Sequence, residues 1–468
     1  MAKDLRQFLQ VVKEAAPHLY AEIKKPLKPE LEVNIIQHKL ARAGRYPIIY
    51  CHEIEGSKIP LVTNIFGDLE SIALALDLDL KIEKSKILQE YMRRVDDPKP
   101  PLEIPPAEAP VKEVVILGKD VDLGLLPILQ QAELNSGKYM GINPLICRDP
   151  VTGILNAGVY RHQLRGKDEL GAYINANNHG AVIARRHGEL GRLMEVAIVI
   201  GHHPAAIFGA CLPADLDINE LEVMGGLLGE PLRVTPAETV ALPVPADAEI
   251  ILEGILDPND WVTDGPYSEF FGYYGEEMPC YRIRVKAITM RKDAIFHDID
   301  PAHREHNFSM LMPLETAIYK TVKSAIPGLI AVHLPPSGSG CHAYISIKQG
   351  VPGEAKRAAL AAVVAARETK LVVVVDEDID IYNDEAVLWA INTRVRGDLD
   401  IDIIPGVIGC RLDPSGPYDE ISHHRSDVGN MTTKVIIDAT KPVRAYHPTR
   451  ITPNKELWAS MNLEDYLI

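Results

Sequence analysis

The chain has 468 residues, which is enough for about three domains of ordinary size. Its composition, 46% hydrophobic and 24% charged, is typical of a folded protein and excludes a largely disordered chain. The 65 acidic and 49 basic residues give a net charge of −16, which argues against a general nucleic-acid-binding protein and against a protein of anionic membrane surfaces.

The six cysteines are scattered, and none forms a Cys-x-x-Cys pair. The sequence therefore predicts neither a zinc site nor a disulfide framework, and a reducing cytoplasm is the expected location. The first residues carry an acid and lead into a polar-interrupted segment, unlike a secretory signal. The apolar runs are too short to span a bilayer.

Residues 1–110 are expected to form an N-terminal α/β domain. Apolar residues at helical spacing predict an amphipathic helix over 4–15. Short apolar runs at 47–50 and 60–63 are typical of strands. Six prolines within the 14 residues of 97–110 predict a stiff, extended linker at the end of this domain.

Residues 111–312 have a β-rich pattern that predicts an open antiparallel sheet or a barrel. The segment 281–288 alternates apolar and polar residues, as a half-buried strand does. Gly, Pro and Asp bound the β-branched runs. The expected strands are 114–117, 196–200, 248–252 and 281–289.

Residues 313–440 alternate between helical and strand patterns, which predicts an α/β layer domain. The expected helices are 314–324 and 354–369, and the expected strands are 329–334, 343–347 and 371–375. In the tail, 441–468, a short segment has one apolar side. A helix this short is marginal alone, so we expect it to dock on its own chain or on a neighbouring subunit.

Unusual polar groups gather in four stretches of the middle domain: 155–161, 174–180, 219–225 and 261–269. Taken singly, Asn156 is explained as a turn residue, His179 as a core histidine and Asp264 as part of a tight turn. Taken together, the stretches supply an amide oxygen, an imidazole and a carboxylate for a divalent metal. They also supply an arginine and two carboxylates for acid–base work on an anionic substrate.

The order of these motifs resembles that of the UbiD-type decarboxylase family. Asn156-x4-Arg161 is followed by His179, then by Glu220-x4-Gly225, and then by Asp264-Gly-Pro-x-x-Glu269 with a Gly-Tyr. The later motifs Asp376-Glu-Asp-Ile-Asp, Trp389-Ala-Ile-Asn-Thr-Arg394 and Thr433-Lys-Val-Ile-Ile-Asp-Ala-Thr440 also match. The resemblance covers roughly residues 110–440.

The resemblance implies a reversible (de)carboxylase that uses prenylated FMN, a divalent metal, usually Mn²⁺, and K⁺ nearby. The implied metal ligands are Asn156, His179 and Glu220, with Glu222 as a competitor to Glu220. Lys434 matches a lysine that contacts the cofactor phosphate. The other implied cofactor-binding residues are Val159, Tyr160, Arg161, Asn178, Cys211, Leu212 and Pro213. The family also implies a flavin-reductase-like split barrel, a homodimer or homohexamer formed by the C-terminal domain, and a flavin prenyltransferase that supplies the cofactor.

Arg161, Asp264 and Glu269 match the family's catalytic arginine and two glutamates. Asp264 departs from the usual glutamate and is one methylene shorter, so a backbone shift or a water is expected to restore its contact with Arg161. Glu269 is the candidate proton donor, which requires a raised pKa; burial and a neighbouring carboxylate favour one.

Substrate choice is expected to depend on the segment 303–312, after the last barrel strand. The candidates there are His303, Arg304, His306 and Leu311. A hydroxybenzoate-like acid is the first expectation and a heteroaromatic acid the second. Three alternatives stay open: a carboxylase subunit acting on a phenol-type acceptor in a larger complex, a flavin-binding scaffold without activity, and a flavin reductase with ordinary FMN.

Overall fold

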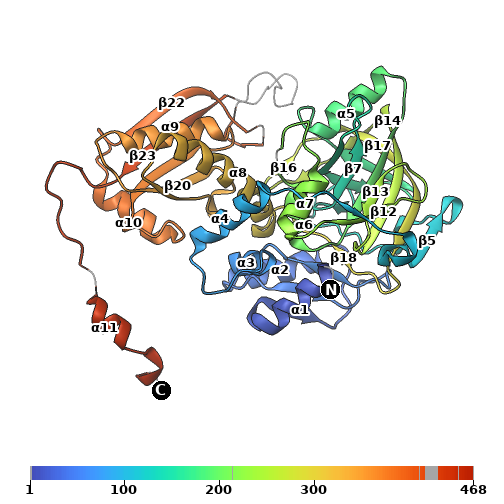
Figure 1. Cartoon of the computed structure of the whole chain (residues 1–468), viewed down its shortest axis with the longest axis horizontal. Helices are drawn as coiled ribbons and strands as arrows, with labels where there is room; N and C mark the ends of the chain where they lie inside the picture. Colours follow the sequence, from blue (N-terminus) through green and yellow to red (C-terminus); the bar gives the residue numbers. More distant parts are fainter. Residues whose placement is uncertain (1–2, 213, 411, 417–430, 452, 467–468) are drawn as a thin grey trace.

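The computed structural model describes residues 3–212, 214–410, 412–416, 431–451 and 453–466. Within these ranges the chain is a mixed α/β structure with three main sheets. The N-terminal elements lie beneath the large middle sheet, and the C-terminal sheet lies beside it (Figure 1). The fold class predicted from the sequence is confirmed.

The N-terminal sheet has four strands in the order β1-β2-β3-β18. Its last strand comes from the end of the middle region and pairs in parallel with β3, so the two regions share a sheet. The predicted first helix is present, with Asp4 as its N-cap. The elements are α1 (Leu5–Ala15), β1 (Tyr20–Ile23), α2 (Glu32–Arg42), β2 (Ile48–Cys51), β3 (Leu61–Thr63), α3 (Leu69–Ala75), α4 (Lys84–Val95) and β18 (Phe296–His297).

The proline-rich segment is extended, and it is fastened to the middle region. It contains β4 (Leu102–Glu103), which pairs in parallel with β12 (Arg233–Pro236). The Lys99 N–H also donates to the Glu222 carbonyl at 2.9 Å. These bonds satisfy backbone groups that a free linker would leave to water.

The middle region curls a nine-stranded sheet into a half-barrel, with β14 and β17 at its centre. Their β-branched, alternating sequences form the longest antiparallel pair, which bulges at two points. The remaining elements are β5 (Val114–Leu117), β6 (Tyr139–Met140), β7 (Pro144–Arg148), β8 (Leu155–Val159), β9 (Arg161–Leu164), β10 (Glu169–Tyr173), α5 (His179–Glu189), β11 (Met194–Ile200), α6 (Pro204–Ala210), α7 (Glu220–Leu228), β13 (Pro243–Pro245), β14 (Ile250–Asp264), β15 (Tyr267–Ser268), β16 (Tyr274–Gly275) and β17 (Met278–Met290).

The C-terminal sheet has the order β19-β20-β21-β23-β22 and is covered on one face by α8 and α9. The tail leaves this body after β23, and α11 stands apart from it in Figure 1. The elements are α8 (Arg304–Ala325), β19 (Leu329–His333), β20 (His342–Ile347), α9 (Glu354–Ala365), β21 (Leu371–Asp376), α10 (Asp384–Arg394), β22 (Ile401–Ile408), β23 (Met431–Ala439) and α11 (Lys455–Ser460).

The helix predicted over 314–324 begins ten residues earlier than expected, at Arg304. Pro313 lies inside it. A proline favours the first turn of a helix and disrupts its interior. The sequence pattern therefore predicts that the helix begins beside Pro313 and does not pass through it. Burial of the first half of α8 overrides that local preference. The segment 303–312, on which substrate choice is expected to depend, is therefore helical from Arg304 onward.

Glu305 fastens α8 to the N-terminal sheet. Its carboxyl is fully buried and accepts the Asn64 N–H at 2.7 Å and the Thr63 hydroxyl at 3.3 Å. Burial raises its pKa to about 8, against the opposing effect of these hydrogen bonds.

We predict that Glu305 makes the protein less stable as pH rises from about 4.5 to 8. In this window the folded protein keeps a proton that the unfolded chain has lost, so stability falls with pH by up to about 1.4 kcal/mol per pH unit. The Glu305→Gln variant removes this titration. Melting temperatures measured from pH 5.5 to 8.5 are expected to fall more steeply in the wild type. Parallel profiles would contradict the assignment.

Candidate active site

A cavity of about 540 Å³ lies where the middle sheet meets the C-terminal domain. Strands β8 and β9 line one side, and the start of α5 and the end of α6 line another. Helix α8 and residues Arg367, Glu368, Cys410 and Leu412 of the C-terminal domain close it. The cavity is therefore built from segments that are distant in sequence.

The three predicted metal ligands lie together at one end of this cavity. Asn156 Nδ2 is 2.8 Å from Glu220 Oε1, and His179 Nδ1 is 3.6 Å from the same oxygen. Asn156 lies on β8, while His179 and Glu220 are the first residues of α5 and α7. Glu222, the competing candidate, does not line the cavity and accepts a hydrogen bond from Asn219 at 3.2 Å.

The electrostatics at this end of the cavity favour a cation. Glu220 is 2% exposed, and burial raises the pKa of its carboxyl to about 7. Burial also lowers the pKa of His179, so its imidazole is neutral and able to bind a metal. A divalent cation beside Glu220 would offset the cost of burying its charge. Among the described residues, no cluster of three or more His, Cys, Asp and Glu side chains is placed to hold a metal, so a metal at this end of the cavity would need the Asn156 amide oxygen as a ligand.

Arg161 joins the two candidate catalytic carboxylates at the cavity wall. Asp264 Oδ2 accepts from Arg161 Nε at 2.8 Å and from Nη2 at 2.5 Å, and Glu269 Oε1 accepts from Nη1. Burial opposes the charge on Arg161, but the two carboxylates outweigh it and raise its pKa. The arginine is therefore a permanent cation between two acids. The Asp264 contact is direct, so the shorter side chain needs no bridging water.

Two aromatic rings enclose the Arg161 guanidinium. Its Cζ lies 4.3 Å from the centre of the Tyr173 ring and 4.5 Å from that of the Tyr267 ring. Ring faces attract cations, and this attraction is stronger in a desolvated site. The two rings therefore fix the plane in which Arg161 meets Asp264 and Glu269.

We predict that Tyr267→Leu lowers kcat by about 10-fold or more, because a cation–π contact in a desolvated site contributes about 2 kcal/mol. Tyr267→Phe keeps the ring and is expected to retain most of the activity. Steady-state kinetics of the two variants test the role of the ring. Equal losses would instead assign the effect to the hydroxyl.

Most of the residues implied to bind the cofactor line the cavity: Asn156, Val159, Tyr160, Arg161, Asn178, His179, Cys211, Leu212 and Glu220. Pro213 lies outside the described residues. Lys434 is fully buried away from the cavity, and its ammonium donates to the carbonyls of Arg367 and Thr369 at 2.6 Å each. Its place on the interior strand β23 turns it to these carbonyls, and its contact with a cofactor phosphate stays a prediction.

Of the four substrate candidates, only His306 lines this cavity. In a helix, residues three and four positions apart share one face, so Ser309, Met310 and Pro313 line the cavity with it. Leu311 is buried, and Arg304 lines a separate cavity, where it lies over the Tyr46 ring. His303 contacts Gln37 at 3.1 Å.

Sequence reasoning missed Tyr173, Tyr267 and Arg367 as residues of the site. Tyr267 stands inside the Asp264–Glu269 motif, which was a usable signal. Tyr173 is the last residue of β10 and Arg367 follows α9, and the patterns of these two elements contain no sign of the cavity. Their position is a consequence of how the barrel and the C-terminal domain meet.

In the part of the chain that the structure describes, no helix combines the length and the apolar character needed to cross a membrane.

Three family models match nearly the whole chain. They are the N-terminal, Rift-related and C-terminal domains of 3-octaprenyl-4-hydroxybenzoate carboxy-lyase, over residues 15–95, 103–303 and 308–439. Among curated relatives, a phenolic acid decarboxylase of Sedimentibacter hydroxybenzoicus is 32% identical, covering 94% of this chain and 92% of its own. An anhydromevalonate phosphate decarboxylase of Methanosarcina mazei is 33% identical, with 93% and 96% covered.

Solved structures agree over the full length. The UbiD-class enzyme HmfF from Pelotomaculum thermopropionicum, in complex with FMN, superposes with a TM-score of 0.91 at 32% identity, covering 99% of this chain and 100% of that one. An evolved dimeric form of HmfF, in complex with prFMN, gives 0.87 at 32% identity, with 100% of both chains covered. A 3,4-dihydroxybenzoic acid decarboxylase from Enterobacter cloacae gives 0.88 at 29% identity, with 98% and 99% covered.

Proposed function

This chain belongs to the UbiD family of decarboxylases, and we propose that it catalyses the reversible, non-oxidative decarboxylation of an aromatic or heteroaromatic carboxylic acid. The observation that carries the proposal is the Arg161 bridge between Asp264 and Glu269, which lies at the wall of a cavity with metal-type ligands. A hydroxybenzoate-like acid is the first expectation.

Prenylated FMN is the cofactor that we propose for the cavity. The cofactor supplies the electron sink that no amino-acid side chain provides when carbon dioxide leaves. Asn156, His179 and Glu220 would hold a divalent metal, Mn²⁺ by family resemblance, with K⁺ nearby. The buried Glu220 carboxyl supports this, because a cation would stabilise its ionised form.

The chain's own residues position and protonate the substrate. Arg161 holds Glu269 against the cavity and offers positive charge to an anionic acid. Glu269 gives a proton to the carbon from which carbon dioxide has left. Asp264 is fully buried and keeps the guanidinium in place from the opposite side. A fixed donor beside the reacting carbon avoids the cost of recruiting one from water.

The walls of the cavity support an aromatic substrate. The Tyr267 and Phe270 rings line the cavity together with Glu269. Burial lowers the pKa of His306, whose ring lies 5.9 Å from that of Phe270. A neutral imidazole at this place suits the phenolic hydroxyl of a hydroxybenzoate. Two arguments support a hydroxybenzoate as the acid. One is the neutral His306 imidazole as a partner for a phenolic hydroxyl, and the other is the similarity to relatives named for phenolic acids.

Other copies of this chain are the proposed partners. In the tail, Leu457 and Trp458 are 60% and 74% exposed, which is unusual for large apolar side chains on a short helix. Docking on a neighbouring subunit would cover them, in a homodimer or homohexamer. A flavin prenyltransferase is the proposed source of the cofactor.

The proposal is tested by co-expressing the chain with a flavin prenyltransferase and measuring the mass of the released cofactor. FMN plus one five-carbon prenyl unit, near one per chain, is the expected result. Carbon dioxide release is then screened with hydroxybenzoates, furan and pyrrole carboxylates and, as a contrast, phosphorylated aliphatic acids. Plain FMN with steady oxidation of NADH or NADPH would favour a reductase instead. Absence of both flavin and metal would favour a scaffold.

A further inference from the structure

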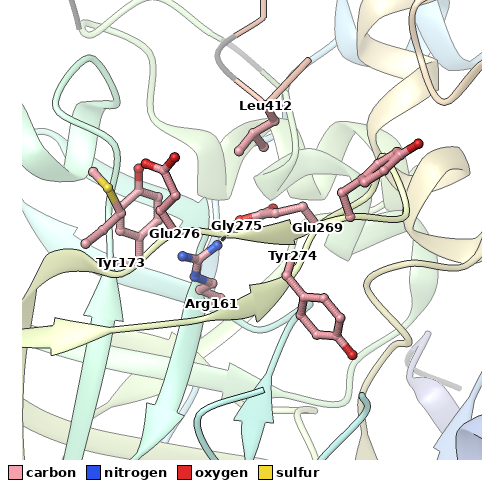
Figure 2. A pocket seen from close by; sticks show the side chains of 9 residues that line it. Arg161, Tyr173, Glu269, Tyr274, Gly275, Glu276 and Leu412 are labelled. Atoms are coloured by element: carbon pink, nitrogen blue, oxygen red, sulfur yellow. Dashed lines mark hydrogen bonds and ion pairs between the residues drawn. The ribbon is translucent and has the colours of Figure 1, made fainter. Parts of the chain in front are cut away.

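A second, smaller pocket of about 70 Å³ lies beside Glu269 (Figure 2). Glu269 and Arg161 line both this pocket and the large cavity, so the two cavities adjoin at these residues. In Figure 2 the Glu269 side chain extends toward the guanidinium, and Glu276 also faces the small pocket.

The backbone behind Glu269 leaves its carboxyl accessible from this side. Glu269 follows β15, and the chain returns through β16, where Gly275 faces it. A Cβ atom on Gly275 would lie 3.1 Å from Glu269 Cγ and Oε1. The glycine therefore keeps open the space that a side chain would take from the pocket.

The rim of the pocket reaches the protein surface. Tyr273 and Tyr274 are 62% and 42% exposed, and Glu276, which is half-buried, lines the same pocket as Glu269. A volume of 70 Å³ holds several water molecules, since one needs roughly 10–15 Å³ by this measure. Carboxylates and a guanidinium give these waters polar partners.

The proposed reaction uses one proton in each turnover. The carboxylate substrate and one water yield the protonated carbon product, carbon dioxide and hydroxide. Glu269 gives its proton to the carbon from which carbon dioxide has left, and it must regain one before the next turnover. While substrate or product fills the large cavity, that side of Glu269 is covered.

We propose that the small pocket returns protons to Glu269 through water, with Glu276 as the residue that relays them from solvent. This inference rests on the proposed function, because it takes Glu269 as the proton donor. Glu276 does not touch the reacting atoms. Its role is to keep Glu269 supplied with protons.

The test compares the first turnover with later ones in the prenylated-FMN holoenzyme. Before mixing, Glu269 has had time to equilibrate with solvent, so loss of the relay spares the first turnover. In Glu276→Gln we expect a first turnover at the wild-type rate, followed by steady turnover about 10-fold slower. Glu276→Asp keeps a carboxyl and is expected to restore most of the steady rate. Glu277→Gln changes an exposed neighbour outside the pocket and is the matched control.

Two kinetic results would overturn the inference while leaving the proposed function intact. One is a steady rate in Glu276→Gln equal to that of the wild type. The other is a first turnover slowed as much as the later ones, which indicates a distorted site. No turnover of any acid by the wild-type holoenzyme would overturn the proposed function and this inference with it.

Discussion

Replacing Glu269 with glutamine is expected to lower turnover by at least about 100-fold, and by up to about 10,000-fold, while fold and cofactor content stay unchanged. A positioned general acid contributes an effect of this size. Glutamine keeps the length of the side chain and an oxygen that accepts from Arg161, so the guanidinium loses no partner. What the variant lacks is the proton.

The measurement is carbon dioxide release from the best acid found in the substrate screen, together with flavin absorbance and melting temperature. Glu277→Gln makes the same chemical change at an exposed position nearby and is expected to behave as the wild type. Wild-type rates in Glu269→Gln would remove Glu269 from the role of proton donor. Loss of flavin in this variant would show that the carboxylate supports cofactor binding instead.

Much of the fold was predictable because its strands have distinctive local patterns. The alternation in 281–288 marks β17, and the apolar run 371–375 marks β21. The start of α8 was not predictable, since Pro313 contradicts the packing that decides it. Local preference and tertiary contact agree in the two strands and conflict in the helix.

The candidate site, like the fold, was only partly predictable from the sequence. Asn156, His179 and Glu220 were grouped from spaced motifs, and the structure brings them to one end of a cavity. A matching motif does not by itself place a side chain in the site. Arg394 pairs with Asp376 and Asp378 at 2.9 and 2.8 Å, within the C-terminal domain and outside the cavity lining. In this chain, that part of the family pattern forms an ion-pair cluster within the C-terminal domain.

Removing the His179 imidazole is expected to remove metal and flavin together. His179 begins α5 and lies 3.6 Å from the Glu220 carboxyl, so it and Glu220 would hold the same cation. Without that cation, Glu220 and the cofactor phosphate repel each other in a site of low polarity. We expect His179→Ala, purified after co-expression with the prenyltransferase, to contain less than about a tenth of the wild-type metal and flavin, since loss of one metal ligand costs at least as much affinity as loss of the groups that orient it.

The matched control is His187→Ala, two turns further along α5, where the imidazole contacts the Arg148 carbonyl at 3.1 Å outside the cavity lining. This variant tests whether the loss of any histidine from α5 disturbs the binding of metal and flavin. We expect it to keep both. Metal is measured by elemental analysis and flavin by absorbance, so neither readout depends on turnover. Stoichiometric flavin in His179→Ala would make His179 a structural residue. Flavin without metal would show that the flavin binds independently of the metal. The buried charge of Glu220 would then need another partner.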